Sequence, residues 1–393
     1  MNQKAKVAII SNVMCVGGVE IALIEMLKAF DYDLYEVTLY LREPGGAFFT
    51  KLDNRVTVRY WGQTDSRHCL AHQLKSLHFI SFAKGLYNRI SARRHRSDWA
   101  RNEFAAIKSL GSFSDEQYDV VIAYHGATPG VLATALYGLN GKQRVAWIHG
   151  KDSFPVGNEL FWSKQYESFH KIACVSDSIQ SWFTKQYPTT SGKTSVLYNL
   201  LDADRILALA EEKPEIPAGK QGWQLLTVGR LSEVKGQTMI PKTCRILLDM
   251  GHEFYWYLVG DGPLRTKIEQ EICKYRVSDR VFLLGTKENP YPYIKNCDIY
   301  VQTSFSEGYC TTTMEAKILH KPVVTTNAPG MREQFVSGEN GLIVDAMTPE
   351  ALANGIASLL DHPALREKII KNLKQNPFDN LSERKKIYDF IRG

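Results

Sequence analysis

The feature of the sequence that most constrains its fold is a regular alternation of short apolar runs with longer stretches of helical periodicity. Such alternation predicts parallel sheets in which crossover helices join successive strands, an α/β fold class. The expected strands are 6–10, 36–41, 118–123, 144–148, 171–175, 195–198, 224–228, 255–259, 280–284, 299–302, 322–325 and 342–344, and the expected helices include 18–30, 235–250, 264–275, 309–319 and 349–360.

A charged segment without periodicity divides this alternation into two halves. Residues 211–222 contain two prolines and two glycines among charged side chains, which is typical of a linker. Each half is long enough to bury its own core. We therefore expect one domain at 1–210, the linker at 211–222, a second domain at 223–375, and a C-terminal helix at 376–393 that crosses back to the first domain.

Composition excludes several classes of protein. The chain has 393 residues, 44% hydrophobic and 23% charged, which is ordinary for globular proteins and unlike disordered or fibrous chains. No apolar run approaches the roughly 18 residues that a membrane span needs, and the apolar run at 7–10 is too short for a secretory signal. The seven cysteines are scattered without a Cys-x-x-Cys pair, which indicates reduced thiols in the cytoplasm rather than a zinc site.

The positive charge is concentrated in one segment. Of the net charge of +6, residues 67–101 contribute eight Lys or Arg and one acid (+8 − 1 = +7), which leaves −1 for the rest of the chain. Apolar residues at helical spacing precede the arginines at 70–77. A basic amphipathic element suits an anionic membrane surface, and the alternative is a solvated helix that covers the first domain. No nucleic-acid-binding module accompanies the segment, so we expect no nucleic-acid partner. The arginines assigned to this basic patch are Arg89, Arg93, Arg94 and Arg96.

The most informative loop follows the expected strand 299–302 and runs into the helix 309–319. Ligands of open α/β sheets bind beyond the carboxyl ends of the strands, and the amides at a helix N-terminus suit an anion such as diphosphate. Glu307 lies in this loop beside Gly308, which allows a ligand to approach the backbone closely. Glu315 lies further along the helix, where its carboxylate can accept both hydroxyls of a vicinal diol such as ribose.

A second loop, after the expected strand 224–228, carries positive side chains. Arg230 and Lys235 lie between Gly229 and Gly236. A guanidinium fork and an ammonium group can stabilise a doubly charged diphosphate leaving group without a metal.

Three further features follow expected strands. Gly260 and Gly262 form a Gly-x-Gly turn without the third glycine of the dinucleotide fingerprint, so it either contacts a base or ribose or is simply a tight turn. Gly17 and Gly18 allow the backbone to approach a phosphate or sugar. His149 ends a strand, where it can bond a sugar hydroxyl or move a proton.

Two Asp-x-Asp triplets are poor candidates for a metal site. The triplet at 31–33 lies between a helix and the start of the next strand, at the wrong end of the sheet, and the triplet at 202–204 resembles a helix N-cap. We therefore expect no metal and no cofactor.

Taken in their order along the chain, the motifs resemble those of the retaining glycosyltransferases of family 4, which have the GT-B fold. The resemblance implies two Rossmann-like domains facing each other across a cleft, with the acceptor bound by the first and the nucleotide-sugar by the second. It is dense from about 145 to 360 and sparse from 45 to 115, where these enzymes bind varied acceptors. The matching residues are Gly17, Gly18, Glu20, Gly229, Arg230, Leu231, Lys235, Gly236, Glu307 and Glu315, with 260–263, 321–324 and 338–345.

The resemblance also implies a role for each of these residues. Arg230 and Lys235 would hold the diphosphate and stabilise the leaving nucleotide, Glu307 would bind the donor hexose, and His149 would contact the sugar near its reacting carbon. Glu315 would bind the ribose hydroxyls. The other expected donor-binding residues are Gly17, Gly18, Gly229, Gly260, Gly262, Gly308, Tyr309, Cys310 and Thr311.

The expected activity is the metal-independent transfer of a hexose from a UDP-sugar to a lipid-linked or polysaccharide acceptor in the synthesis of capsule or lipopolysaccharide. The enzyme would work in the cytoplasm, on the inner face of the plasma membrane. The alternatives are a GT-B sugar-nucleotide epimerase, which needs no acceptor, and a non-catalytic nucleotide-sugar-binding membrane scaffold. Cys310 and His320 stand where relatives have small residues or glycine, so the identity of the donor sugar does not carry over.

Overall fold

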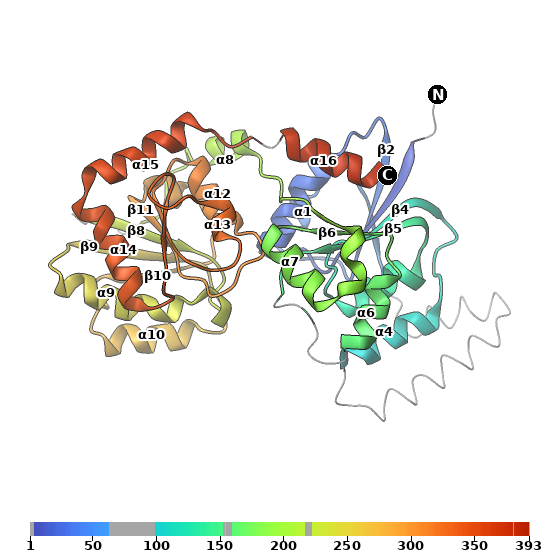
Figure 1. Cartoon of the computed structure of the whole chain (residues 1–393), viewed down its shortest axis with the longest axis horizontal. Helices are drawn as coiled ribbons and strands as arrows, with labels where there is room; N and C mark the ends of the chain where they lie inside the picture. Colours follow the sequence, from blue (N-terminus) through green and yellow to red (C-terminus); the bar gives the residue numbers. More distant parts are fainter. Residues whose placement is uncertain are drawn as a thin grey trace. The chain divides into compact units, whose positions relative to one another are not determined.

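The chain folds into two compact α/β units. The computed structural model describes residues 4–62, 99–151, 154, 159–216, 222–379 and 381–392. The first unit comprises Met1–Leu200 with Glu383–Gly393, and the second comprises Leu201–Ser382 (Figure 1). Each unit contains one parallel sheet with helices packed on it, so the α/β class expected from the alternation is confirmed.

The first unit is built on a seven-stranded parallel sheet with the order β3-β2-β1-β4-β5-β6-β7. The central strand β1 is apolar because both of its faces are covered. Its Ile9 pairs with Leu39 on one side and Ile122 on the other, and all three side chains are buried. The strands are β1 (Ala5–Ile10), β2 (Tyr35–Leu41), β3 (Thr57–Tyr60), β4 (Gln117–Ala123), β5 (Asn140–Ile148), β6 (Lys171–Cys174) and β7 (Thr194–Val196).

The helices of the first unit connect these strands. Phe104 of α4 packs edge-on against Phe161 and Trp162 of α6. The helix α7 begins at Ser176, whose Oγ accepts a hydrogen bond from the Ile179 amide at 3.2 Å, as expected for an N-cap serine. The helices are α1 (Gly18–Ala29), α4 (Trp99–Leu110), α5 (Pro129–Ala133), α6 (Glu159–Glu167) and α7 (Asp177–Gln186).

The C-terminal helix α16 (Leu381–Arg392) belongs to the first unit, where it lies beside α1 and β2 (Figure 1). Arg384 Nη2 donates to the carbonyl of Ala29 at the end of α1 at 2.6 Å, and Tyr388 donates to the same carbonyl. The ring of Tyr388 also stacks on Tyr35. The two hydrogen bonds satisfy a carbonyl group that has no intrahelical partner at the end of α1.

The second unit is built on a six-stranded parallel sheet with the order β10-β9-β8-β11-β12-β13. The order changes direction between β8 and β11, which is the point where open α/β sheets bind ligands. The strands are β8 (Trp223–Val228), β9 (Phe254–Val259), β10 (Val281–Gly285), β11 (Ile299–Gln302), β12 (Val323–Thr326) and β13 (Leu342–Val344). The helices are α8 (Ala203–Leu209), α9 (Ile240–Asp249), α10 (Arg265–Lys274), α11 (Tyr291–Asn296), α12 (Thr311–Ile318), α13 (Met331–Gln334), α14 (Pro349–Asp361) and α15 (Pro363–Gln375).

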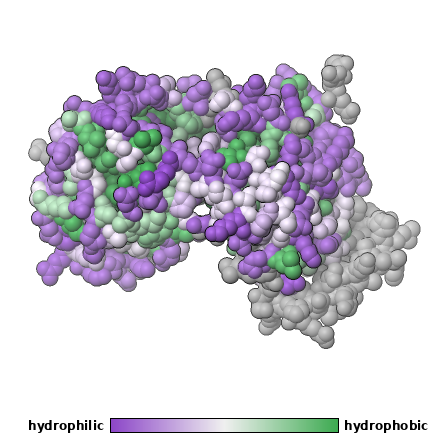
Figure 2. Space-filling model, viewed as in Figure 1, coloured by the Kyte–Doolittle hydropathy of each residue, from purple (hydrophilic) through white to green (hydrophobic). Residues whose placement is uncertain are grey.

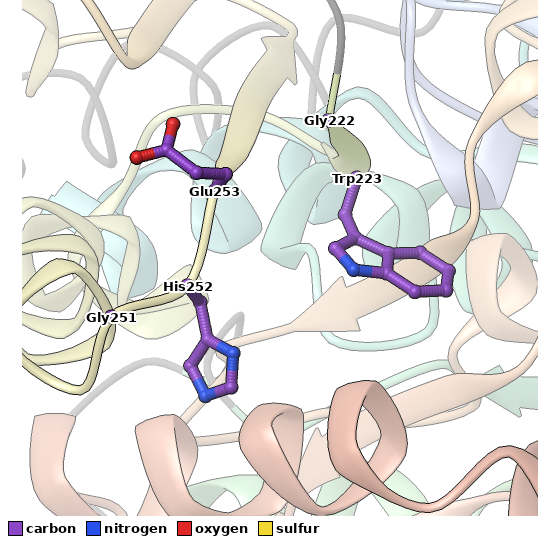
Figure 3. Close-up of a pocket in the computed structure, with 5 residues that line it drawn as sticks. All are labelled: Gly222, Trp223, Gly251, His252 and Glu253. Atoms are coloured by element: carbon purple, nitrogen blue, oxygen red, sulfur yellow. The ribbon is translucent and has the colours of Figure 1, made fainter.

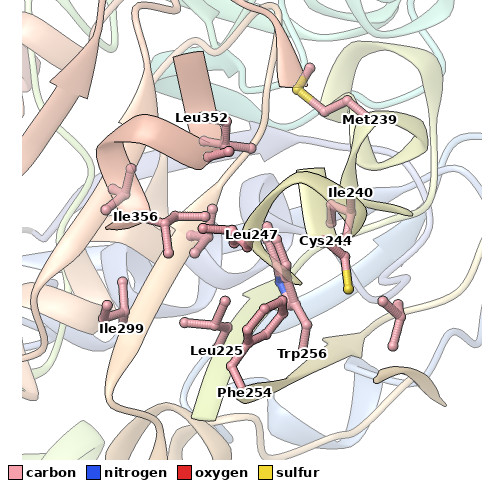
Figure 4. Close-up of a cluster of buried hydrophobic side chains, with 14 of the residues drawn as sticks. Leu225, Met239, Ile240, Cys244, Leu247, Phe254, Trp256, Ile299, Leu352 and Ile356 are labelled. Atoms are coloured by element: carbon pink, nitrogen blue, oxygen red, sulfur yellow. The ribbon is translucent and has the colours of Figure 1, made fainter. Parts of the chain in front are cut away.

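Two hydrophobic layers cover the faces of this second sheet. One layer joins the sheet to α9, α10, α14 and α15, and it includes Trp256, Leu247 and Ile356 (Figure 4). The other layer joins the sheet to α8, α11, α12 and α13, and it includes Tyr300 and Met314. Because described helices cover both faces, we expect a ligand to bind at the loops beyond the ends of the strands rather than on a face of the sheet.

Hydrophilic residues cover much of the face that Figure 2 shows, with hydrophobic residues between them. Over the described parts of the chain, the structure contains no helix that is both long and apolar enough to span a membrane.

Each expected strand has a counterpart in the two sheets, but three details differ. The strand β3 was not expected, because its half-buried residues give only a weak pattern. The helix expected from residue 235 begins at Ile240, because Gly236 has a φ of +65° and breaks the helix into short turns. Residues 201–210, expected in the first domain, pack with the second unit, because α8 contacts α11 and α12. Of the expected linker, 217–221 lie outside the described residues.

Candidate functional site

Two loops of the second unit bring together the charged residues that the motifs singled out. One loop follows β8 and contains Arg230 and Lys235, and the other follows β11 and contains Glu307. Since β8 and β11 are neighbours in the sheet, their carboxyl ends deliver both loops to the same edge. The Phe305 amide donates to the Val234 carbonyl at 2.8 Å and so ties one loop to the other.

Lys235 and Glu307 form a close ion pair across these loops. Lys235 Nζ lies 2.7 Å from Glu307 Oε1 and 2.9 Å from Oε2. The side chain of Glu307 is 8% exposed and that of Lys235 is 26% exposed. A carboxylate this buried needs a positive or donating partner, because its desolvation is costly. An ammonium group carries three donors, so Lys235 can contact a carboxylate and a phosphate together.

Two buried polar residues hold Glu307 from the sheet side. Ser304 Oγ donates to Glu307 Oε1 at 2.5 Å, and Gln302 Nε2 donates to the same oxygen at 3.2 Å. Sequence reasoning missed both residues, because a serine and a glutamine at the end of a strand carry no distinctive pattern. Their contacts fix the position of the carboxylate.

Glycines allow the loops to pack backbone against backbone. A Cβ on Gly236 would lie 2.2 Å from the Thr303 carbonyl oxygen, and one on Gly260 would lie 2.1 Å from that of Gly229. A Cβ on Gly262 would lie 2.4 Å from the carbonyl oxygen of Leu231. The Gly-x-Gly turn therefore packs directly on the loop that contains Arg230. This close packing explains why glycine is needed at both positions of the turn.

Arg230 extends from this packed segment. Its side chain is exposed, while its carbonyl accepts from Gln237 Nε2 at 2.9 Å. Gln237 is 1% exposed and was not predicted as part of the site. The buried amide holds the backbone from which the guanidinium projects.

Glu315 lies on α12, behind the second loop. Its side chain is 1% exposed, and Tyr291 OH of α11 donates to Oε1 at 3.4 Å. Of the residues between the two glutamates, Gly308 and Tyr309 are partly exposed, and Cys310 and Thr311 are buried. Burial, and next the charge of Glu307, raise the pKa of the Cys310 thiol to about 11. The thiol therefore stays protonated at neutral pH and is no nucleophile.

The first unit positions Gly17, Gly18 and a pair of histidines beyond β1, β4 and β5. Glu20 turns back toward Gly17, where a Cβ would lie 2.4 Å from its carboxylate. His125 Nε2 lies 3.7 Å from Glu20 Oε1, and His125 Nδ1 lies 2.8 Å from Ser11 Oγ.

His149 lies beside His125, with ring centroids 6.2 Å apart. Both ring nitrogens of His149 are buried. Burial, and next the proximity of His125, lower the pKa of His149 well below its usual value. The neutral ring can donate from one nitrogen and accept at the other.

The residues predicted from sequence thus fall into two groups. Gly17, Gly18 and His149 belong to the first unit, and the remaining donor-site residues belong to the second. The basic patch of Arg89, Arg93, Arg94 and Arg96 lies outside the described residues.

The acidic triplets have structural roles. Asp202 Oδ1 caps α8 by accepting from the Arg205 amide at 2.9 Å, as predicted. Asp31 Oδ1 accepts from the Asp33 amide at 3.0 Å in the turn before β2. Within the described part of the chain, no three His, Cys, Asp or Glu side chains are grouped as metal ligands.

Two surface hollows lie away from these loops. A hollow of about 420 Å³ is lined by Gly222, Trp223, Gly251, His252 and Glu253 (Figure 3). It lies where β8 and β9 begin, at the opposite edge of the sheet from the charged loops. A hollow of about 550 Å³ in the first unit likewise lies where β1, β4 and β5 begin.

Two family models match most of the chain. The model of "Glycosyltransferase Family 4" matches residues 16–205, and that of "Glycosyl transferases group 1" matches residues 210–376. They meet near the expected linker.

Curated relatives are glycosyltransferases. An uncharacterized glycosyltransferase of Methanocaldococcus jannaschii, MJ1059, is 24% identical over 70% of this chain and 70% of its own length. The 4-alpha-N-acetylgalactosaminyltransferase of Campylobacter jejuni that acts on an N-acetylgalactosamine-N,N'-diacetylbacillosaminyl-diphospho-undecaprenol is 28% identical over 46% of this chain and 47% of its own length. The capsular polysaccharide biosynthesis glycosyltransferase CapM of Staphylococcus aureus is 27% identical over 37% of this chain and 38% of its own length.

Solved structures share the fold. Anabaena HepE, in complex with UDP and glucose, has a TM-score of 0.70 and 19% identity over 99% of this chain and 100% of its own. S. aureus TarM, in complex with UDP, has a TM-score of 0.71 and 12% identity over 99% of this chain and 100% of its own.

Proposed function

Because the chain belongs to glycosyltransferase family 4 and has the GT-B fold, we propose that it transfers a hexose from a UDP-sugar to a lipid-linked or polysaccharide acceptor. The product would be a cell-surface glycan. The observation that carries the proposal is the gathering of Arg230, Lys235 and Glu307 at the edge of the second sheet where β8 and β11 end. Two cationic side chains suit the diphosphate of a nucleotide-sugar, and a carboxylate can accept hydrogen bonds from the hydroxyls of its sugar.

The roles follow from the chemistry of these side chains. Arg230 and Lys235 hold the diphosphate and stabilise the charge that develops on it as the bond to the sugar breaks, which is the largest catalytic contribution. Glu307 accepts from hydroxyls of the hexose. His149, as a neutral ring, contacts the sugar near its reacting carbon.

The reaction proceeds with retention of configuration. The acceptor oxygen attacks the anomeric carbon on the face from which the diphosphate departs. The bond from that carbon to the diphosphate breaks, the bond to the acceptor oxygen forms, and the acceptor's proton passes to the diphosphate. Because the two side chains supply the positive charge, the proposal needs no divalent metal.

Solved neighbours support UDP as the nucleotide. HepE is known in complex with UDP and glucose, and TarM in complex with UDP. In this chain, Glu315 would accept the ribose hydroxyls. Its position, buried on α12 behind the loop of Glu307, suits a ligand whose ribose lies beyond the diphosphate.

Named relatives support a glycan acceptor. The C. jejuni relative acts on a diphospho-undecaprenol-linked sugar, and two others are named for lipopolysaccharide core and capsular polysaccharide biosynthesis. We extend this to a lipid-linked or polysaccharide acceptor for the present chain.

A lipid-linked acceptor implies work at a membrane surface, which we place on the cytoplasmic side. Trp99, which begins α4 directly after the basic patch, is 66% exposed, and Leu160 of α6 is 74% exposed. The Arg101 guanidinium lies 5.2 Å from the ring of Phe161, next to Leu160. Exposed tryptophan and cationic side chains suit the interface of an anionic bilayer. Binding to vesicles that does not respond to anionic lipid or salt would contradict this part.

The experiment that tests the function measures release of free nucleotide from a panel of nucleotide-sugars, with and without membrane extract, and with EDTA. We expect release that depends on extract and is unaffected by EDTA. Lys235→Ala should abolish most of it, and Glu315→Ala should chiefly raise the KM for the donor. The matched control is Lys242→Ala, which removes a lysine paired with Glu350 on the surface and should leave release unchanged.

Two alternatives predict other results. A sugar-nucleotide epimerase would convert the donor without any acceptor, and a non-catalytic scaffold would bind it without releasing nucleotide. Undiminished turnover by Lys235→Ala would contradict the assigned site under either enzymatic function.

A further inference from the structure

A chain of buried polar side chains runs along β11 behind the charged loops. Tyr300 and Gln302 are neighbours on one face of this strand, and they are 0% and 1% exposed. Tyr300 OH lies 3.2 Å from the Val228 carbonyl oxygen, at the end of β8, and 3.1 Å from Gln302 Oε1. The chain therefore begins at the strand that leads into the Arg230 loop and ends at Glu307.

The hydrogen bonds of Gln302 define the orientation of its amide. Its Oε1 accepts from Tyr300 OH, and its Nε2 donates to Ser304 Oγ at 2.8 Å and to Glu307 Oε1 at 3.2 Å. A flipped amide would turn its oxygen toward the carboxylate, where two acceptors would oppose each other. Ser304 Oγ accepts from Gln302 Nε2 and donates to Glu307 Oε1 at 2.5 Å.

These contacts make the two oxygens of Glu307 unequal. Oε1 accepts from Ser304, Gln302 and Lys235, which exhausts what one carboxylate oxygen can accept. The hydrogen bond found to Oε2 comes from Lys235 at 2.9 Å. One oxygen is thus committed to the protein, and the other retains the capacity to accept from a ligand.

We propose that Gln302 is a positioning residue that, together with Ser304, turns Glu307 Oε2 toward the donor and so sets which sugar hydroxyl the enzyme recognises. This inference rests on the proposed function. It assigns to Gln302 a larger influence on the sugar than on the nucleotide, because Gln302 contacts Glu307 directly and reaches Lys235, which holds the diphosphate, only through that carboxylate.

The test compares binding of UDP with binding of UDP-glucose, UDP-galactose and UDP-N-acetylglucosamine by calorimetry. The first variant is Gln302→Glu, which keeps the shape of the side chain but replaces its hydrogen-bond donor Nε2 by an acceptor oxygen. The second is Ser304→Ala, a smaller change that tests the proposal if Gln302→Glu does not fold. The matched control is Thr227→Val, which removes two buried hydrogen bonds of the same sheet, one from Trp256 Nε1 at 3.1 Å and one to the Val301 carbonyl at 2.8 Å, and leaves every side chain that contacts Glu307 in place.

We expect wild type to bind one UDP-sugar more tightly than UDP. Gln302→Glu should weaken that sugar's binding about tenfold, the value of one lost hydrogen bond to a charged group, while changing the affinity for UDP less than threefold. The ratio of the affinities of Gln302→Glu for UDP-glucose and UDP-galactose should lie closer to one than in wild type. Ser304→Ala should change the affinities in the same direction. Thr227→Val should keep the wild-type ratios.

Each other outcome is decisive. A wild type that binds no nucleotide overturns the proposed function and this inference with it. A wild type that prefers a UDP-sugar, with both variants keeping that preference, overturns the inference alone. It is also overturned if wild type binds UDP and the UDP-sugars equally, or if Thr227→Val loses the preference as well.

Discussion

Replacing Lys235 by Met while Glu307 stays in place is expected to destabilise the second unit by about 2–3 kcal/mol. Removing one partner of a buried ion pair costs about 3–5 kcal/mol, because the remaining charge is desolvated and unpaired. The lower figure applies here because Lys235 is 26% exposed and because Ser304 and Gln302 still donate to the carboxylate. The perturbation thus measures how much of the charge of Glu307 the lysine balances.

The assay is urea unfolding, monitored through the hydrogen exchange of the peptide that contains β11 and α12. With a slope of about 2 kcal/mol per molar urea, the midpoint should fall by about 1–1.5 M. Adding Glu307→Gln to Lys235→Met should restore most of the loss, because the amide needs no counter-charge. Lys242→Met, at a surface pair, should move the midpoint little.

The reasoning would be refuted by a Lys235→Met variant as stable as wild type, since Glu307 would then not depend on its lysine. A double variant no more stable than the single one would refute it as well.

Three further perturbations address other positions. In wild type, burial lowers the pKa of the folded His149, so the unfolded chain binds the proton more readily below the ordinary pKa of 6.5. Wild-type stability should therefore fall by up to about 1.4 kcal/mol per pH unit between pH 6.5 and 5. Thermal melts of His149→Phe between pH 7 and 5 should lack this pH dependence. Parallel pH profiles of the two proteins would contradict the burial. Gly236→Ala should destabilise the chain by about 2 kcal/mol or more and abolish nucleotide release, since φ is +65° and the new methyl would lie 2.2 Å from the Thr303 carbonyl oxygen; Gly192→Ala, with open space around it, is the control that should melt like wild type. His320→Gly should raise the melting temperature by about 1–3 °C, because it relieves a left-handed conformation at φ +55°, and a lowered melting temperature would show that the imidazole contributes more than the strain costs.

The alternation of apolar runs and helical stretches was enough to predict both sheets, because strands covered on two faces must be apolar throughout. The same pattern predicted that Arg230, Lys235 and Glu307 follow strands. It could not predict that Lys235 and Glu307 touch, because their contact depends on the course of two loops separated by 72 residues.

Other features of the site left weaker traces in the sequence. The early start expected for α9 was wrong because Gly236 was taken as part of the helix, although a glycine beside a charged loop also suits a left-handed turn. His125 was missed, although a His-Gly pair follows both β4 and β5 and so marked two places at the same edge of the sheet. Gln302 was beyond reach, because its meaning lies in the hydrogen bonds of a buried amide.

The central claim is that positive side chains of the second unit carry the charge of the departing nucleoside diphosphate. A crystal structure of the chain grown with UDP in the presence of EDTA tests it most directly. We predict that the diphosphate lies within hydrogen-bond distance of the Arg230 guanidinium and Lys235 Nζ, with the ribose hydroxyls on Glu315. A nucleotide seated away from the ends of β8 and β11, or bound there only when a divalent metal replaces the EDTA, would contradict the account.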